Sequence, residues 1–246
     1  MIRRPPRSTL SPSSAASDVY KRQVLYMCRV LVFEFFIDNV RIEEFKGKRV
    51  LEVGSRYVNG SIRPFIEKFL KPREYIGVDI MPGKFVDMLV PAEKLLDTFG
   101  PESFDVVVCT ETLEHILNWR SAINNMKGVL KRGGYITTVK RGFPLHAYPY
   151  DFWRYELNDM KMIFKDFEII ILKEGIGHSI LLKARKPTQY RANKLDDIAL
   201  YSVILGKRTK SIPDIKDVPV FRKLKFIGAE NLTKLGKLLL SLIKET

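Results

Sequence analysis

Short apolar runs alternate along the middle of the chain with segments whose apolar residues follow a helical period. The runs at 49–53, 75–80, 86–90, 104–109, 135–139, 167–174 and 178–184 predict strands, most of them buried on both faces. The segments at 61–70, 92–99, 119–130 and 156–165 predict the intervening helices, the third ending at Gly133-Gly134. This alternation indicates an α/β fold with a mostly parallel sheet, right-handed crossovers and helices on both faces.

The last two predicted strands have no helix between them. Glu174-Gly175-Ile176-Gly177 separates them and favours a short hairpin-like turn. The seventh strand is therefore expected to run antiparallel to its neighbours.

Residues 24–46 are rich in Val, Leu and Phe, so a membrane span has to be considered. Arg29, Glu34 and Asp38 interrupt the run, whereas a spanning helix needs about 20 nearly uncharged residues. A buried helix beside the sheet, ended by Gly47, is the better prediction. Its apolar positions recur at helical spacing: Val32, Phe33, Phe36, Ile37 and Val40.

Two of the predicted strands end in an acid, and the first is followed by a turn of small residues. Glu52-Val53-Gly54 closes the strand at 49–53, and Asp79 closes the strand at 75–80. The carboxyl ends of neighbouring parallel strands meet at one edge of a sheet, where a loop and a carboxylate can bind a nucleoside. Ser55-Arg56-Tyr57 replaces the glycines that a pyrophosphate would need, so no dinucleotide is expected, and Arg56 and Tyr57 are expected to crowd a conventional loop.

Five segments in order resemble the successive motifs of class I S-adenosylmethionine-dependent methyltransferases. They are Glu52-Val53-Gly54-Ser55, Gly77-Val78-Asp79-Ile80, Ser103-Phe104-Asp105-Val106-Val107, Thr110-Glu111-Thr112-Leu113-Glu114-His115 and Leu130-Lys131-Arg132-Gly133-Gly134-Tyr135. The similarity covers residues 45–185. It implies a Rossmann-like seven-stranded methyltransferase sheet with an antiparallel last strand.

The resemblance also implies S-adenosyl-L-methionine as the cofactor and gives roles to particular residues. Residues 52–55 would hold the methionine portion, Asp79 the ribose diol, and the segment that follows it the adenine face. Pro91 stands where relatives have an acid, which leaves the Ala92 backbone and Glu93 to contact adenine. The expected cofactor-binding residues are Glu52, Gly54, Ser55, Asp79, Ile80, Met81, Ala92, Glu93 and Thr110.

The catalytic candidates follow the fourth and fifth predicted strands. Glu111 should lie near the methyl acceptor, and His115 is either a base or a packing histidine. The aromatic segment 140–155 resembles that of small-molecule and polysaccharide-cluster methyltransferases and is expected to form an acceptor pocket with Asp151 and Arg154; the alternative is a loop whose rings cover the sheet edge. His146, in that segment, is the favoured general base.

The chain has 246 residues and a net charge of +14, of which residues 1–23 and 187–246 together carry +10. Residues 1–23 show no hydrophobic period, resemble translated adapter sequence, and are expected to be non-native or disordered. The methyltransferase domain is expected at 24–186. A basic, partly helical extension should follow at 187–246, and its run at 232–243 would contact a membrane surface, a partner or its own domain.

The chain has two cysteines, and its three histidines are far apart in sequence. Cys28 and Cys109 fall in predicted buried elements, which is typical of packing thiols in a reducing compartment, and we expect no metal site. A cytoplasmic location is expected.

The predicted function is methyl transfer to a small-molecule acceptor, with a sugar or glycan precursor and an oxygen acceptor atom favoured on resemblance alone. Two alternatives stay open. The basic 187–246 segment would suit an RNA methyltransferase, although it carries no aromatic platform for bases. Ser55 and Pro91 would suit a methyltransferase fold that has lost its activity and serves as an interaction module.

Overall fold

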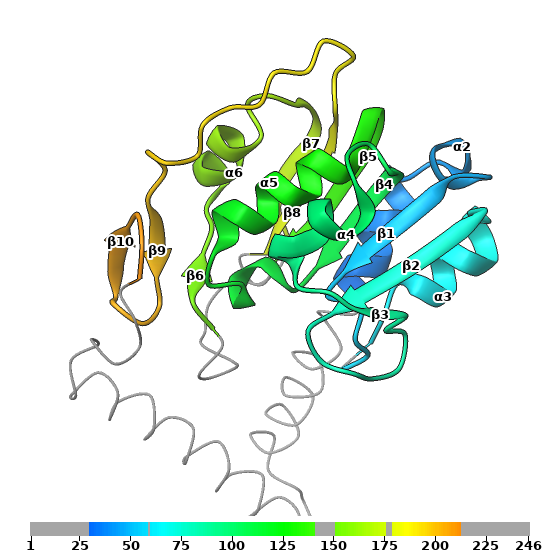
Figure 1. The fold of residues 1–246 in the computed structure, drawn as a ribbon, viewed down its shortest axis with the longest axis horizontal. Coiled ribbons are helices and arrows are strands. Elements are labelled where there is room, and N and C mark those ends of the chain that lie inside the picture. Colours follow the sequence, from blue (N-terminus) through cyan, green and yellow to red (C-terminus); the bar gives the residue numbers. More distant parts are fainter. Residues whose placement is uncertain (1–29, 59, 141–150, 176–178, 213–246) are drawn as a thin grey trace, which may run out of the picture.

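The structure is a computed structural model that describes residues 30–58, 60–140, 151–175 and 179–212 (Figure 1). Its centre is a seven-stranded sheet with the order β3-β2-β1-β4-β5-β8-β7. The strands are β1 (Arg49–Val53), β2 (Glu74–Asp79), β3 (Met88–Leu89), β4 (Phe104–Thr110), β5 (Leu130–Lys140), β7 (Glu168–Glu174) and β8 (Ile180–Arg185). Strand β8 is antiparallel to both β5 and β7, while β1 to β5 pair in parallel. The predicted fold, including its antiparallel last strand, is confirmed.

All four predicted helical segments form between the strands. They are α3 (Arg63–Phe65) continued by η1 (Ile66–Leu70), η2 (Ala92–Lys94) continued by α4 (Leu95–Phe99), α5 (Trp119–Val129) and α6 (Leu157–Ile163). The predicted stop of α5 at Gly133-Gly134 is wrong. Helix α5 ends at Val129, and the glycines lie within β5, where the register against β4 shifts and Gly133 adopts a φ of 76°.

The helices cover the two faces of the sheet separately, with α4, α5 and α6 in front and α3 behind in Figure 1. Residues 30–39 form a helix on the α3 face, where Val32, Phe35 and Phe36 are buried. Two expectations for this helix are wrong. Ile37 is 62% exposed, and the helix ends at residue 39, so that Gly47 instead follows a second short helix, α2 (Ile42–Phe45).

The connection from β2 to β3 contains no helix. Residues 80–87 form a loop, and β3 is only two residues long instead of the five that the sequence predicts. The loop remains close to the sheet through hydrogen bonds from Asp87 N to Gly77 O (2.8 Å) and from Gly77 N to Asp87 Oδ2 (2.7 Å). It therefore forms one side of the carboxyl edge of the sheet.

A three-stranded antiparallel sheet, called the small sheet below, lies beside the main one and was not predicted. It contains β6 (Trp153–Arg154), β9 (Leu200–Ser202) and β10 (Lys207–Thr209), in the order β10-β9-β6. Strands of two or three residues are too short to show a period in the sequence. Leu195, Ile198, Leu200 and Ile204 join the main core, so residues 187–212 contribute to the fold of a domain that we expected to end at 186.

A buried ammonium group joins this region to α5 and α6. Lys127 is 1% exposed, and its Nζ donates to Ile163 O (2.5 Å), Asp166 Oδ1 (2.6 Å) and Asn193 Oδ1 (3.0 Å). Burial lowers the pKa of Lys127, and the Asp166 carboxylate opposes that shift. A buried charge of this kind is stable only while its partners remain in place.

No helix among the described residues is long and apolar enough to cross a membrane. Cys109, on β4, is buried, as expected; Cys28 and the 232–243 run lie outside the described residues.

Candidate active site

The loop after β1 depends on a glycine at its first position. Gly54 has a φ of +77°, a left-handed conformation that is costly for residues with a side chain. A Cβ placed on it would lie 2.0 Å from Thr112 Oγ1. The loop after β1 and the turn after β4 are therefore in contact, as expected for segments that meet at the carboxyl edge of a parallel sheet.

Asp79, at the end of β2, holds the neighbouring loops through both carboxylate oxygens. Its Oδ2 accepts from Arg56 N (3.3 Å), and its Oδ1 accepts from Met81 N (2.9 Å). A carboxylate has about four acceptor positions, so each oxygen retains capacity for one more donor. Asp79 has the turn-forming role that a strand-end acid often plays, and it can also bind a pair of hydroxyls.

The apolar residues beside Asp79 are unusually exposed. Ile80 is 67% exposed and Met81 51%, and Leu89, the cross-strand neighbour of Asp79, is 60% exposed. Apolar side chains next to a partly exposed carboxylate match the two halves of a nucleoside, a flat base and a hydroxylated sugar. The residues present at this edge therefore fit an adenosine moiety.

The side chains that replace the usual loop glycines do not crowd the loop. Ser55 is 2% exposed and packs on Gly77, where an added Cβ would lie 2.7 Å from its Cβ. Arg56 lies over Gly83, with 2.8 Å between its Cγ and the position of an added Cβ. Tyr57 N donates to Lys84 O (3.0 Å). The expected crowding is wrong because Arg56 and Tyr57 turn towards the 80–87 loop, Tyr57 with its ring centre 5.9 Å from that of Phe85.

Glu52 is 2% exposed, and its Oε2 has no hydrogen-bond partner among the described residues. Burial raises the pKa of its carboxyl from 4.5 to about 8; Tyr75 and Arg63 oppose the rise, while Glu67 and Asp87 add to it. The neutral form therefore prevails at pH 7. A cation bound nearby would favour the ionised form and lower this pKa.

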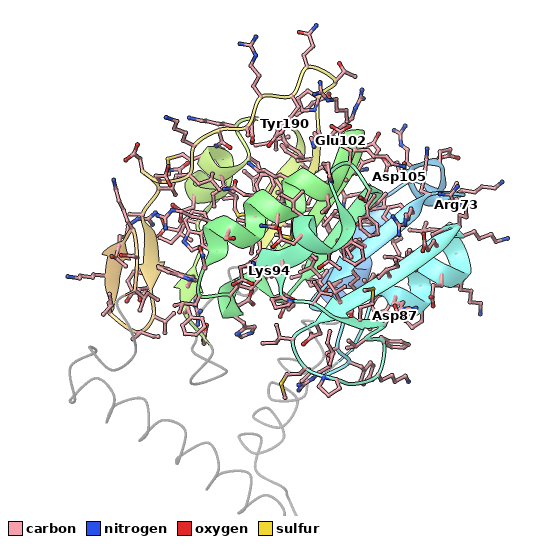
Figure 2. The ribbon with its side chains drawn as sticks, in the orientation of Figure 1. Arg73, Asp87, Lys94, Glu102, Asp105 and Tyr190 are labelled. Atoms are coloured by element: carbon pink, nitrogen blue, oxygen red, sulfur yellow. The ribbon has the colours of Figure 1, made fainter. Side chains whose placement is uncertain are left out.

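The segment expected to contact adenine is the short helix η2. Its N-cap Pro91 is extended and exposed, Ala92 is buried in the core, and Glu93 is half-buried. Lys94, at the end of η2, is labelled in Figure 2. Because the Ala92 side chain packs inwards, only its backbone and the Glu93 side chain remain for contact with a base.

The turn after β4, residues 111–117, begins with a strained residue. Glu111 has a φ of 53°, a conformation that costs about 1–3 kcal/mol for a residue other than glycine and persists only where the surroundings impose it. Thr110 and Glu111 are half-buried beside the β1 loop, and His115 ends the short helix η3 (Leu113–His115). Backbone strain at the edge where the loops converge is typical of a functional site.

The aromatic segment is only partly described, and His146 lies outside the described residues. Asp151 and Arg154 form a buried bidentate ion pair, with 2.7 Å between Nη2 and Oδ2, and Phe152 and Trp153 are buried in the core. In this described part, the side chains form packing contacts, as in the alternative reading of a loop that covers the sheet edge.

The opposite edge of the sheet has a cavity of about 330 Å³ near Asp105. Figure 2 shows Asp105 and Glu102 at that edge and Asp87 at the carboxyl edge. Charged groups around the cavity bind one another: Asp105 pairs with Lys131, and Glu44, also in its lining, pairs with Lys183. The candidate site is therefore the carboxyl edge, where loops, strain and exposed apolar residues converge.

Sequence reasoning gave no individual role to Thr112, which lies in one of the quoted motifs, or to Tyr75. Thr112 contacts Gly54 from a segment 58 positions away in the sequence, and Tyr75 lies beside Glu52 from the neighbouring strand. Local sequence does not predict either contact, because both contacts depend on how the strands are ordered.

Comparison with known proteins agrees with the fold. Residues 51–138 match the family model of a methyltransferase domain. The fold resembles that in a complex between the Haloferax volcanii Trm112 methyltransferase activator and a proposed methyltransferase, with 12% identity, a TM-score of 0.51, and coverage of 69% of this chain and 97% of that one. An S-adenosylmethionine-dependent methyltransferase from Aquifex aeolicus aligns at 16% identity with a TM-score of 0.48, covering 72% of this chain and 98% of its own.

No curated protein sequence matches the chain. At 12% identity the Haloferax volcanii structure bears on the fold alone, and the family model bears on the region from β1 to β5. The family model identifies a methyltransferase domain at residues 51–138, and the strand order of the main sheet is the mostly parallel one, with an antiparallel last strand, that the sequence resemblance implied.

Proposed function

We propose that the carboxyl edge of the sheet binds S-adenosylmethionine and that the enzyme transfers its methyl group to an oxygen of a small molecule, with a sugar or glycan precursor as the acceptor. The observation that carries the cofactor site is Asp79, which retains acceptor capacity between the Gly54 loop and the exposed Ile80 and Met81. Glu52 and the Gly54-Ser55 loop would receive the methionine portion. Ala92 and Glu93 would contact the adenine.

The bound cofactor would supply a methyl group already activated by a sulfonium. The protein then has to place the acceptor in line with that methyl group, exclude water and accept the acceptor's proton. Thr110 and Glu111 follow β4 at the point where the loops converge, so they are placed to border the acceptor. Glu111 and His115, in the turn after β4, are candidates to take that proton, and His146 is a third candidate from the sequence.

The first test is calorimetry with S-adenosylhomocysteine. Asp79→Asn should weaken binding about 10- to 100-fold, since a hydrogen bond to a charged group contributes about 1.5–3 kcal/mol. Asp97→Asn is the matched control, because Asp97 is an exposed carboxylate on α4 with only a surface pair to Lys94. No binding by the natural protein would contradict the proposal, and equal affinities of the two variants would contradict the role of Asp79.

The second test identifies the acceptor class. Labelled methyl transfer is measured against nucleotide sugars, glycans, lipids and RNA. The proposal expects label in a sugar or glycan precursor, on oxygen. Label in RNA alone, with turnover that falls steeply as salt is raised, would replace it with the RNA alternative. Cofactor binding without transfer to any acceptor would favour an inactive binding module.

A further inference from the structure

The turn after β4 is attached to the segment 152–155 by three hydrogen bonds. Phe152 N donates to Glu114 O (2.9 Å), the indole Nε1 of Trp153 donates to Leu117 O (3.1 Å), and the hydroxyl of Tyr155 donates to Leu113 O (3.2 Å). All three acceptors are backbone carbonyls of residues 113–117. These three hydrogen bonds therefore restrain the backbone of the turn.

The segment 152–155 is in turn fixed by the small sheet. Trp153 pairs with Ser202 in an antiparallel register, and Val203 N donates to Phe152 O (2.9 Å). Without β9 and β10, β6 would be two residues with no partner strand among the described elements, too short to hold a position alone. The position of the turn after β4 thus depends on residues beyond position 198.

The guanidinium group of Arg120 adds further contacts between the small-sheet region and α5. Arg120, at the start of α5, donates through Nε to Leu195 O (2.9 Å) and through its two Nη atoms to the carbonyls of Ile198 and Lys210. Its carbon Cζ lies 4.5 Å from the centre of the Trp119 ring. Both ends of the segment that carries the small sheet are thereby tied to the helix that follows the turn.

The position of the turn matters because two of its residues lie at the candidate site. Glu111 is strained at its start, and Thr112 lies against Gly54 in the loop after β1. A shift of the turn would move Thr112 relative to that loop and would release the strained backbone. The family model ends at residue 138, so neither 152–155 nor the small sheet belongs to the matched domain.

We propose that the small sheet holds the turn after β4 in the position that the cofactor site requires, with Trp153, Tyr155 and Arg120 as positioning residues. This inference rests on the proposed function, because it takes the contact between Thr112 and Gly54 as one wall of the site that binds the methionine portion. None of the three residues touches the reacting atoms. They act through the turn.

The test uses two variants of the full chain that loosen the support at different points. Tyr155→Phe retains the ring and removes the donor to Leu113, and Arg120→Lys retains the charge but loses the planar arrangement of donors. Each should weaken S-adenosylhomocysteine binding by about fivefold, the equilibrium effect of one hydrogen bond of ordinary strength. Amide hydrogen exchange of His115 and Ile116, whose N–H groups bond within the turn, should accelerate.

Ile163→Val is the matched control, because Ile163 is fully buried in the same core on α6 and makes none of these contacts. Affinity is measured at a temperature well below each melting point. The inference is overturned if Tyr155→Phe and Arg120→Lys bind S-adenosylhomocysteine normally. It is also overturned if Ile163→Val, at the same loss of melting temperature, loses as much affinity as they do. If the natural protein does not bind S-adenosylhomocysteine, the proposed function fails, and unchanged exchange in the variants would then refute the support of the turn separately.

Discussion

Replacing the buried carboxyl of Glu52 by an amide should change how the stability of the protein depends on pH. The pKa of Glu52 is about 8 in the folded protein, against 4.5 for an unperturbed glutamate. Between these values the folded state retains a proton that the unfolded state has lost. Unfolding then releases a proton, so the free energy of unfolding falls as pH rises, by about 1.4 kcal/mol per pH unit.

From pH 5 to pH 8 this dependence amounts to a loss of about 3.5 kcal/mol, which Glu52→Gln should not show because its amide does not titrate in this range. The free energy of unfolding is measured by urea denaturation of both proteins at pH 5, 6, 7 and 8. Other titrating groups are common to both and cancel in the difference. A difference between the two proteins that stays constant from pH 5 to pH 8 would refute the raised pKa. In Tyr75→Phe the fall in the free energy of unfolding should continue to a higher pH than in the natural protein, because the Tyr75 hydroxyl lowers the pKa of Glu52.

Three further changes test the packing of the site and its support. Gly54→Ala should abolish S-adenosylhomocysteine binding in calorimetry, because its methyl group would overlap Thr112 in a left-handed backbone; normal affinity would show that the loop is not held as described. Lys127→Met leaves the Asp166 carboxylate buried without its ion-pair partner and should lower the free energy of unfolding by about 3–5 kcal/mol in urea, whereas a loss below about 1 kcal/mol would contradict a buried pair. Lys71→Gly should raise the free energy of unfolding by about 1 kcal/mol, because exposed Lys71 follows η1 with a φ of 50°. An unchanged free energy of unfolding would mean that the strain is offset elsewhere.

The proposed cofactor side of the site was more accessible to sequence reasoning than the proposed acceptor side. Asp79 and Gly54 follow strands whose apolar runs are long enough to recognise, and parallel strands bring their carboxyl ends together whatever the loops do. Thr112, Tyr75 and the strain at Glu111 depend on contacts between segments far apart in the chain. No local pattern marks them, because a side chain that fills space beside a distant glycine can be of many types.

By itself the sequence determined the order and kind of the main elements, because burial on both faces of a sheet imposes continuous apolar runs and burial on one face of a helix imposes a period of 3.6 residues. The sequence also identified Glu52, Gly54 and Asp79 as residues at the carboxyl ends of neighbouring strands. Only the tertiary structure decided the ionisation of Glu52, which follows from burial beneath α3 and η1, and the role of residues 187–212, whose short strands form through pairing with β6. Both depend on which distant groups are neighbours in space, a property that local sequence does not encode.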